Sequence, residues 1–162
     1  EAISGRKVIN INEKILVYHK NPKGNKAAKT YKEEKDITRA FMDTSILTSR
    51  ITETLANRVG FLSTTKYFKS LGVPKRFESL KDAQAYIEQN QQALTLEENI
   101  ERVAKIMDDD IVKVRPVVNL WVKISGEIKE IEVVIIEDSD YPLTIGRNEL
   151  KGYLIDTSNT FK

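Results

Sequence analysis

The sequence predicts a mainly β fold that is interrupted by a helical segment, within the α+β class. Residues 6–20 alternate apolar and polar side chains and are rich in β-branched residues, which is typical of strands. Residues 112–138 show the same period of two. Between these regions, apolar residues recur at helical spacing. Strands on both sides of a run of helices indicate a β fold with a helical insertion.

Further strands are predicted around these regions. Residues 37–43 read as a strand that ends at Asp43, and "GYLIDTS" at 152–158 reads as the closing strand. Gly126 marks a hairpin turn between strands at 117–125 and 128–137. The Pro/Gly/Lys-rich stretch at 21–35 predicts a solvated loop, with a patch for an acidic partner as the less favoured reading. Its basic residues are Lys20, Lys23, Lys26, Lys29, Lys32 and Lys35.

Three or four helices are predicted in the middle of the chain. The segment 49–60 places Ile51, Leu55 and Val59 on one face and ends at Gly60. Weaker spacing indicates a helix over 64–72, and a cap at Ser79 favours one over 79–92.

The fourth helix is predicted over 95–110. Thr95 and Glu98 form a capping-box pattern ahead of an apolar stripe, and Asp108–Asp110 would be its solvated end. We therefore expect a single domain over residues 1–162, with a helical insertion at about 61–111.

Bulk properties exclude several classes of function. The 162 residues suffice for one domain with a core, and the net charge of +2 favours neither nucleic acid nor membrane as a partner. There is no Cys, and no apolar run approaches the length of a membrane span. We expect a cytoplasmic or virion-associated protein. The chain begins with Glu1 rather than Met, so we expect that an initiator residue or a longer leader is missing.

The sequence also lacks the residues that most enzyme mechanisms need. His19 is the only histidine, so a Ser-His-Asp triad has no visible partner for it, and no H-E-x-x-H zinc motif exists. The phosphate-binding motifs G-x-x-x-x-G-K-S/T and G-x-G-x-x-G are both absent. We expect no cofactor and no metal. Carboxylate chemistry is what remains.

Two segments carry a resemblance to a family. "AFMDTSILTSRITETLANRVGF" and "YPLTIGRNEL" resemble, in the right order, the two signatures of retropepsin-type aspartic peptidases. The stretch from "VRPVVNLWVKISG" to "YLIDTSNTF" is similar to the bacterial and phage branch labelled "putative ATP-dependent zinc protease". The resemblance covers residues 36–60 and 112–162 and implies a small closed β-barrel of retropepsin (acid protease) type. It also implies an aspartic endopeptidase. The proteins beside which members of this branch are found suggest glutamate-rich tails as a substrate.

The resemblance also implies a role for each site residue. Asp43 would be a catalytic carboxylate, Thr44 would hydrogen-bond across the dyad, and Ser45 would occupy the turn. Gly146 would allow its strand to pack against the Asp43 loop. Arg147 and Asn148 would brace the loops and satisfy nearby backbone groups.

One carboxylate is half of such a site. Asp156, in "IDTS", has only six residues after it, too few for a second lobe, so we interpret it as the end of a strand. The second carboxylate would then be Asp43 of another copy, because two carboxylates held close share one proton and can act as acid and base. The expected partners are a second copy in a homodimer and a peptide or protein substrate.

Two departures from the family pattern keep a second function open. Ser45 stands where the family strongly prefers Gly, and the predicted helices stand where the family has a β-hairpin flap. The alternative function is therefore a catalytically degenerate retropepsin-fold protein. Such a protein would be a structural or assembly module of a larger, phage-type particle, with neighbouring subunits as partners.

Overall fold

The computed structural model describes residues 2–3, 6–20 and 35–157. Its strands fall into two sheets. The three-stranded sheet contains β1 (Ala2–Ile3), β2 (Arg6–Asn10) and β10 (Tyr153–Asp156). The seven-stranded sheet contains β3 (Asn12–Tyr18), β4 (Lys35–Met42), β5 (Ser49–Thr52), β6 (Arg102–Asp108), β7 (Ile111–Ile124), β8 (Glu127–Ile136) and β9 (Leu143–Ile145).

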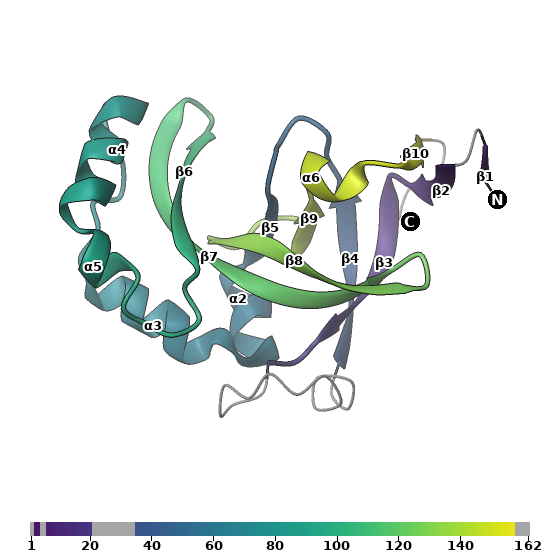
Figure 1. Cartoon of the computed structure of the whole chain (residues 1–162), viewed down its shortest axis with the longest axis horizontal. Coiled ribbons are helices and arrows are strands. Elements are labelled where there is room, and N and C mark those ends of the chain that lie inside the picture. The colour runs from purple at the N-terminus through teal and green to yellow at the C-terminus, as the bar shows by residue number, and fades with distance from the viewer. Residues whose placement is uncertain (1, 4–5, 21–34, 158–162) are drawn as a thin grey trace.

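Most helical residues lie between β5 and β6. The helical elements are α2 (Glu53–Ala56), the segment η1 (Asn57–Phe61), which is kinked at Val59 and Gly60, α3 (Leu62–Ser70), α4 (Leu80–Gln89), α5 (Gln91–Leu94) and, after β9, α6 (Arg147–Leu150). Figure 1 shows α3, α4 and α5 gathered on one side, beside β6, with β1, β2 and β10 on the opposite side.

Six strands of the larger sheet close into a barrel. The strand order is β3-β4-β9-β5-β8-β7-β6, and β3 also pairs with β7 through Leu16↔Lys123 and Val17↔Val122. The closing pair joins the two ends of the six-strand run and leaves β6 as an edge strand outside the ring. Closure removes the free edges that an open sheet would present. The predicted mainly β fold with a small closed barrel and a helical segment is confirmed.

Alternating residues of the barrel strands fill its interior. Ile15 and Val17 on β3, Val122 on β7 and Val133 on β8 are fully buried in one cluster. Because successive side chains on a strand point to opposite faces, the period of two seen in the sequence is what puts these residues inside.

A second core lies under the helices. Phe68 of α3, Ala83 and Ile87 of α4, and Leu94 of α5 pack on Val112 and Val114 of β7. Strand β7 is 14 residues long, so its second half closes the barrel and its first half supports the helices. The helices are thus packed on an extension of the barrel sheet.

The helix predicted over 49–60 begins later than expected. Residues 49–52 form β5, which pairs with β8 and β9 inside the barrel, and Thr52 caps α2 by accepting a bond from the Leu55 amide. Sheet pairing therefore overrides the helical spacing of Ile51. The predicted helices over 64–72 and 79–92 are confirmed by α3 and α4, and Ser79 caps α4 by accepting a bond from the Asp82 amide.

The helix predicted over 95–110 is wrong. Residues 102–108 form β6, which pairs antiparallel with β7 from Arg102↔Val117 to Asp108↔Ile111. The Thr95 hydroxyl donates to the Gln91 carbonyl at 2.8 Å, so Thr95 ends α5 and caps nothing after it. Helical residues of the middle region thus lie within 53–94, and 102–111 belong to a hairpin.

No helix within the described part of the chain is long and apolar enough to cross a membrane. The lysine-rich loop predicted at 21–35 lies, apart from Lys35, outside the described residues.

Candidate active site

Asp43 follows the last residue of β4, where the barrel opens to solvent. Met42 pairs with Ile145 in the parallel pair β4–β9, and the Asp43 amide donates to the Ile145 carbonyl at 2.9 Å. The side chain of Met42 is 2% exposed, whereas Asp43 is half-buried. The acid therefore lies just past the end of β4, after the buried Met42, at a position that solvent partly reaches.

The carboxylate of Asp43 closes a tight turn with Ser45. Asp43 Oδ1 accepts hydrogen bonds from the Ser45 amide at 2.9 Å and from the Ser45 hydroxyl at 2.6 Å. An Asp side chain that accepts from the amide two residues later forms an Asx turn. No hydrogen bond to Asp43 Oδ2 is found among the described residues, so that oxygen is open to solvent or a ligand.

The Asp43 loop, residues 43–48, is held by the segment that follows β9. The amides of Arg147 and Asn148 donate to the carbonyls of Ile46 and Leu47 at 2.8 and 3.0 Å. Arg147 Nη1 donates to the Thr44 carbonyl at 3.2 Å. The structure therefore brings together all six residues named from the sequence, although Asn148 acts here through its amide.

Gly146 permits the close approach of these two segments. A Cβ at this position would lie 2.7 Å from the Leu47 carbonyl oxygen and 2.9 Å from the Thr48 carbonyl carbon. Both atoms belong to the backbone, so no side-chain movement would relieve the contact. The Gly146 amide donates to the hydroxyl of Ser49, which is 1% exposed, at 3.0 Å. Sequence reasoning assigned no role to Ser49, because only the fold shows its hydroxyl beneath Gly146.

Glu149, on α6, has a raised pKa. Burial raises the pKa of this carboxyl, and the charge and hydrogen bond of Lys129 oppose that effect without cancelling it. The acid thus prefers its neutral form more than an exposed glutamate does.

A groove of about 550 Å³ lies beside the Asp43 loop. One wall is formed by residues 45–48 and Arg50, and the other by residues 102–107 of β6 with Gln84 of α4. The lining includes the cations Arg50, Arg102 and Lys105 and no carboxylate. Arg102 pairs with Glu132 at 2.8 Å, and no ion pair involves Arg50 or Lys105 within the described residues.

The hairpin β6–β7 forms the side of this groove that was predicted to be helical. Its tip, Asp109–Asp110, has positive φ angles of 52° and 66°, as a two-residue hairpin turn requires. In Figure 1, this tip and the loop between β4 and β5 lie at the same end of the molecule. The helices at 53–94 are thus additional to a hairpin and do not replace one.

Other acids and the single histidine lie elsewhere. His19 Nε2 contacts Asp36 Oδ2 at 2.7 Å, and Arg58 approaches the same oxygen at 3.5 Å. Asp36 lies at the opposite end of β4 from Asp43. Asp156 ends β10, where its carbonyl accepts from the Ile11 amide at 2.8 Å. Within residues 2–3, 6–20 and 35–157, no group of three or more His, Asp or Glu side chains could hold a metal ion.

Comparisons with known proteins find similar solved structures. A protein of unknown function (DUF785) from Legionella pneumophila subsp. pneumophila is 12% identical, with 96% of each chain covered and a TM-score of 0.44. The retroviral protease-like domain of Ddi1 from Leishmania major is 14% identical, with 88% of this chain and 77% of that chain covered and a TM-score of 0.42. The Simian Foamy Virus (mac) protease is 13% identical, with 86% and 90% covered and a TM-score of 0.39.

Two of these three are a retroviral protease and a retroviral protease-like domain. At these identities and TM-scores the likeness carries no argument. No family model matches the sequence. No curated protein matches it either.

Proposed function

We propose that the protein is a homodimeric aspartic endopeptidase whose dyad is formed by Asp43 from each of two subunits. The observation that carries this proposal is the Asp43 loop, in which an acid with one open oxygen is braced by Gly146 and Arg147 beside a groove. Peptide hydrolysis without a metal or a nucleophilic side chain needs one carboxylate to activate water and a second to protonate the leaving amine. A second copy would supply the second carboxylate, and the exposed Thr44 would meet its counterpart across the dyad.

The lining of the groove supports an acidic peptide as the substrate. Arg50 and Lys105 face a groove that holds no carboxylate of its own, so acidic side chains on a bound peptide would be attracted. Strand β6 is an edge strand, and its unpaired backbone groups can accept an extended peptide.

A peptide-library cleavage assay at acidic and neutral pH tests the proposal. We expect the wild type to cleave and Asp43→Asn to lose about 10³-fold in rate, because a general acid–base carboxylate is removed. Asp156→Asn is the matched control and is expected to retain activity. Adding Asp43→Asn chains to the wild type should lower activity by forming mixed dimers. Cleavage by a strictly monomeric wild type, or equal loss in Asp156→Asn, would contradict a dyad built from two Asp43 residues.

One observation favours the second function, a degenerate structural or assembly module. Asp43 Oδ1 is already occupied by both the amide and the hydroxyl of Ser45, so the acid also serves the turn. Absence of cleavage across the whole library and pH range would favour this function. The finer assignment to the branch labelled "putative ATP-dependent zinc protease" has no support from the comparisons and remains a hypothesis.

A further inference from the structure

A second cavity, of about 440 Å³, lies on the helical side of the barrel. It is bounded by α2, α3 and the loop after α3 on one side and by β7 and β8 on the other. None of its lining residues lines the groove at the Asp43 loop. Strand β8 contributes to both, with Val134 lining the groove and Ile135 lining the cavity. The volume falls within the range typical of small-molecule sites.

The inner wall of this cavity is apolar. Phe68 and Ile135 are 8% and 2% exposed, and Val73 and Pro116 complete the surface. A ligand that buries an apolar body here would remove apolar surface from water on both sides, which favours binding.

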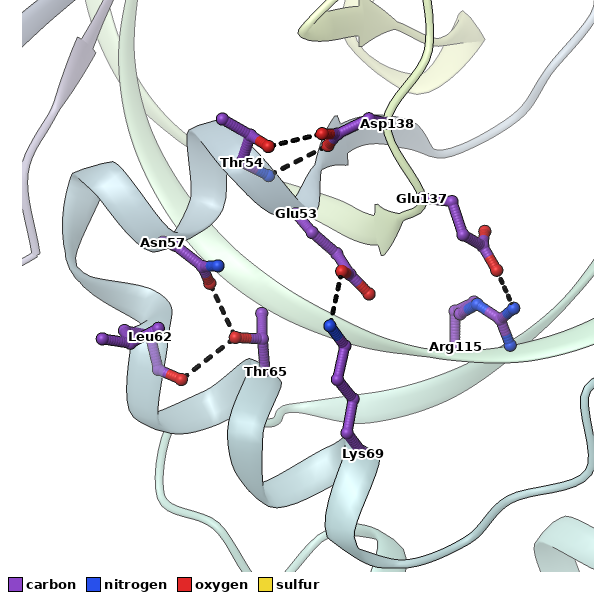
Figure 2. A network of polar contacts seen from close by, with 9 residues as sticks. All are labelled: Glu53, Thr54, Asn57, Leu62, Thr65, Lys69, Arg115, Glu137 and Asp138. Carbon is purple, nitrogen blue, oxygen red and sulfur yellow. Dashed lines mark hydrogen bonds and ion pairs between the residues drawn. The ribbon is translucent and has the colours of Figure 1, made fainter.

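Two ion pairs lie at the rim of the cavity, and Figure 2 shows them side by side. Lys69 Nζ contacts Glu53 Oε1 at 2.9 Å, and Arg115 pairs with Glu137. Burial works to raise the pKa of Glu137, but the hydrogen bond and charge of Arg115, with the charge of Lys113, hold the pKa below its usual value. Glu137 is thus ionised at neutral pH, and its charge is already balanced by cations of the protein.

The residues that line the cavity carry one more positive charge than negative charges. The lining contains three cations, Lys69, Lys75 and Arg115, against the two carboxylates of Glu53 and Glu137. Lys75 is exposed and has no ion pair among the described residues. The cavity therefore combines an apolar wall with one uncompensated positive charge.

We propose that this cavity binds a small amphipathic molecule with an apolar body and a single carboxylate. The apolar body packs against Phe68, Val73 and Ile135, and the carboxylate pairs with Lys75. A neutral apolar molecule would leave the Lys75 charge unused. A cationic one would be repelled by it, because Glu53 and Glu137 are already paired.

Fluorescence titration with dansylglycine tests this proposal on the full chain. The dansyl group supplies the apolar body and the glycine supplies the carboxylate, and emission increases when the dansyl group leaves water. We expect saturable binding, with about fivefold weaker binding of the methyl ester, which corresponds to one exposed ion pair. Lys75→Glu should weaken dansylglycine by at least as much and leave the ester unchanged. Lys81→Glu, an exposed lysine of α4 outside the cavity, is the matched control and should bind like the wild type.

Val73→Phe fills the cavity and should abolish binding of both probes, while circular dichroism confirms that the variant is folded. Failure of dansylglycine to saturate, equal affinity for acid and ester, or unchanged binding by Val73→Phe would each overturn the proposal. None of these outcomes depends on peptide cleavage, so the test stands whether or not Asp43 is catalytic.

Discussion

The Asp43 loop can be compared with the ion-pair network at the rim of the second cavity, which consists of the pairs Glu53–Lys69 and Arg115–Glu137. Both join separate parts of the chain, but they are held in different ways. At the Asp43 loop, three amides of residues 146–148 donate to backbone carbonyls or to the buried Ser49 hydroxyl, and the Arg147 side chain adds one bond to the Thr44 carbonyl. In the network, side chains bond to side chains, as in Glu53–Lys69 and Arg115–Glu137 (Figure 2). The first therefore depends on close fit, and the second depends on charge and should respond to pH and salt.

Gly146→Ala should have the largest effect on stability. The added Cβ meets the backbone of Leu47 and Thr48 at less than 3 Å, so the Asp43 loop must shift. We expect a loss of about 2–3 kcal/mol in the free energy of unfolding, typical of overpacking. Urea unfolding followed by the fluorescence of Trp121, the single tryptophan, measures it.

Gly126→Ala provides the control for this prediction. Its φ of 81° costs a side chain about 1 kcal/mol, but nothing lies within 4 Å of the added Cβ. A Gly146→Ala variant that is no less stable than Gly126→Ala would show that close packing at Gly146 is not what holds the loop.

Ser49→Ala should have an intermediate effect. It removes the acceptor of the Gly146 amide and leaves a buried N–H without this partner, at a cost of about 1–2 kcal/mol. Ser139→Ala removes an exposed hydroxyl that donates to the Tyr141 carbonyl, and it should change stability by less than about 0.5 kcal/mol. Equal unfolding midpoints for the two variants would contradict the stabilising role of the hydrogen bond between the Gly146 amide and the Ser49 hydroxyl.

The two hairpins of β7 show how much of the fold could be predicted. The turn at Ser125–Gly126 has positive φ angles of 49° and 81°, and its glycine made this turn predictable from the sequence. The turn at Asp109–Asp110 needs similar angles but contains no glycine, and the residues before it also fit a helical stripe. Pairing with β7 decides between the two structures, and a pairing partner is a tertiary property that local spacing does not contain.

The candidate site was predictable to a similar degree. Asp43, Gly146 and Arg147 were found because they lie in two short motifs, and the structure brings those motifs together. Ser45 stands where the family strongly prefers Gly, yet the described non-glycine residues with positive φ are only Asp109, Asp110 and Ser125. The turn at Ser45 thus does not require glycine. Neither the groove nor the second cavity could be predicted, because each is assembled from elements that are distant in sequence.

Glu137→Gln should have the smallest effect, and that effect should depend on pH. Because the folded-state pKa of Glu137 is below the usual 4.5, its ionised form stabilises the fold above pH 4.5, and this contribution is lost as the pH falls through the folded-state pKa. Glu137 is half-exposed, so we expect a loss of about 0.5 kcal/mol at neutral pH. The difference from the wild type should shrink as the pH falls below 4.5 and through the folded-state pKa, and it should also shrink in high salt. Glu130→Gln changes an exposed glutamate of β8, the strand that precedes Glu137, with no ion pair in the described part of the chain, and it should match the wild type at neutral and at low pH. If the deficit of Glu137→Gln persisted at low pH, packing rather than charge would hold this network, and the contrast with the Asp43 loop would fail.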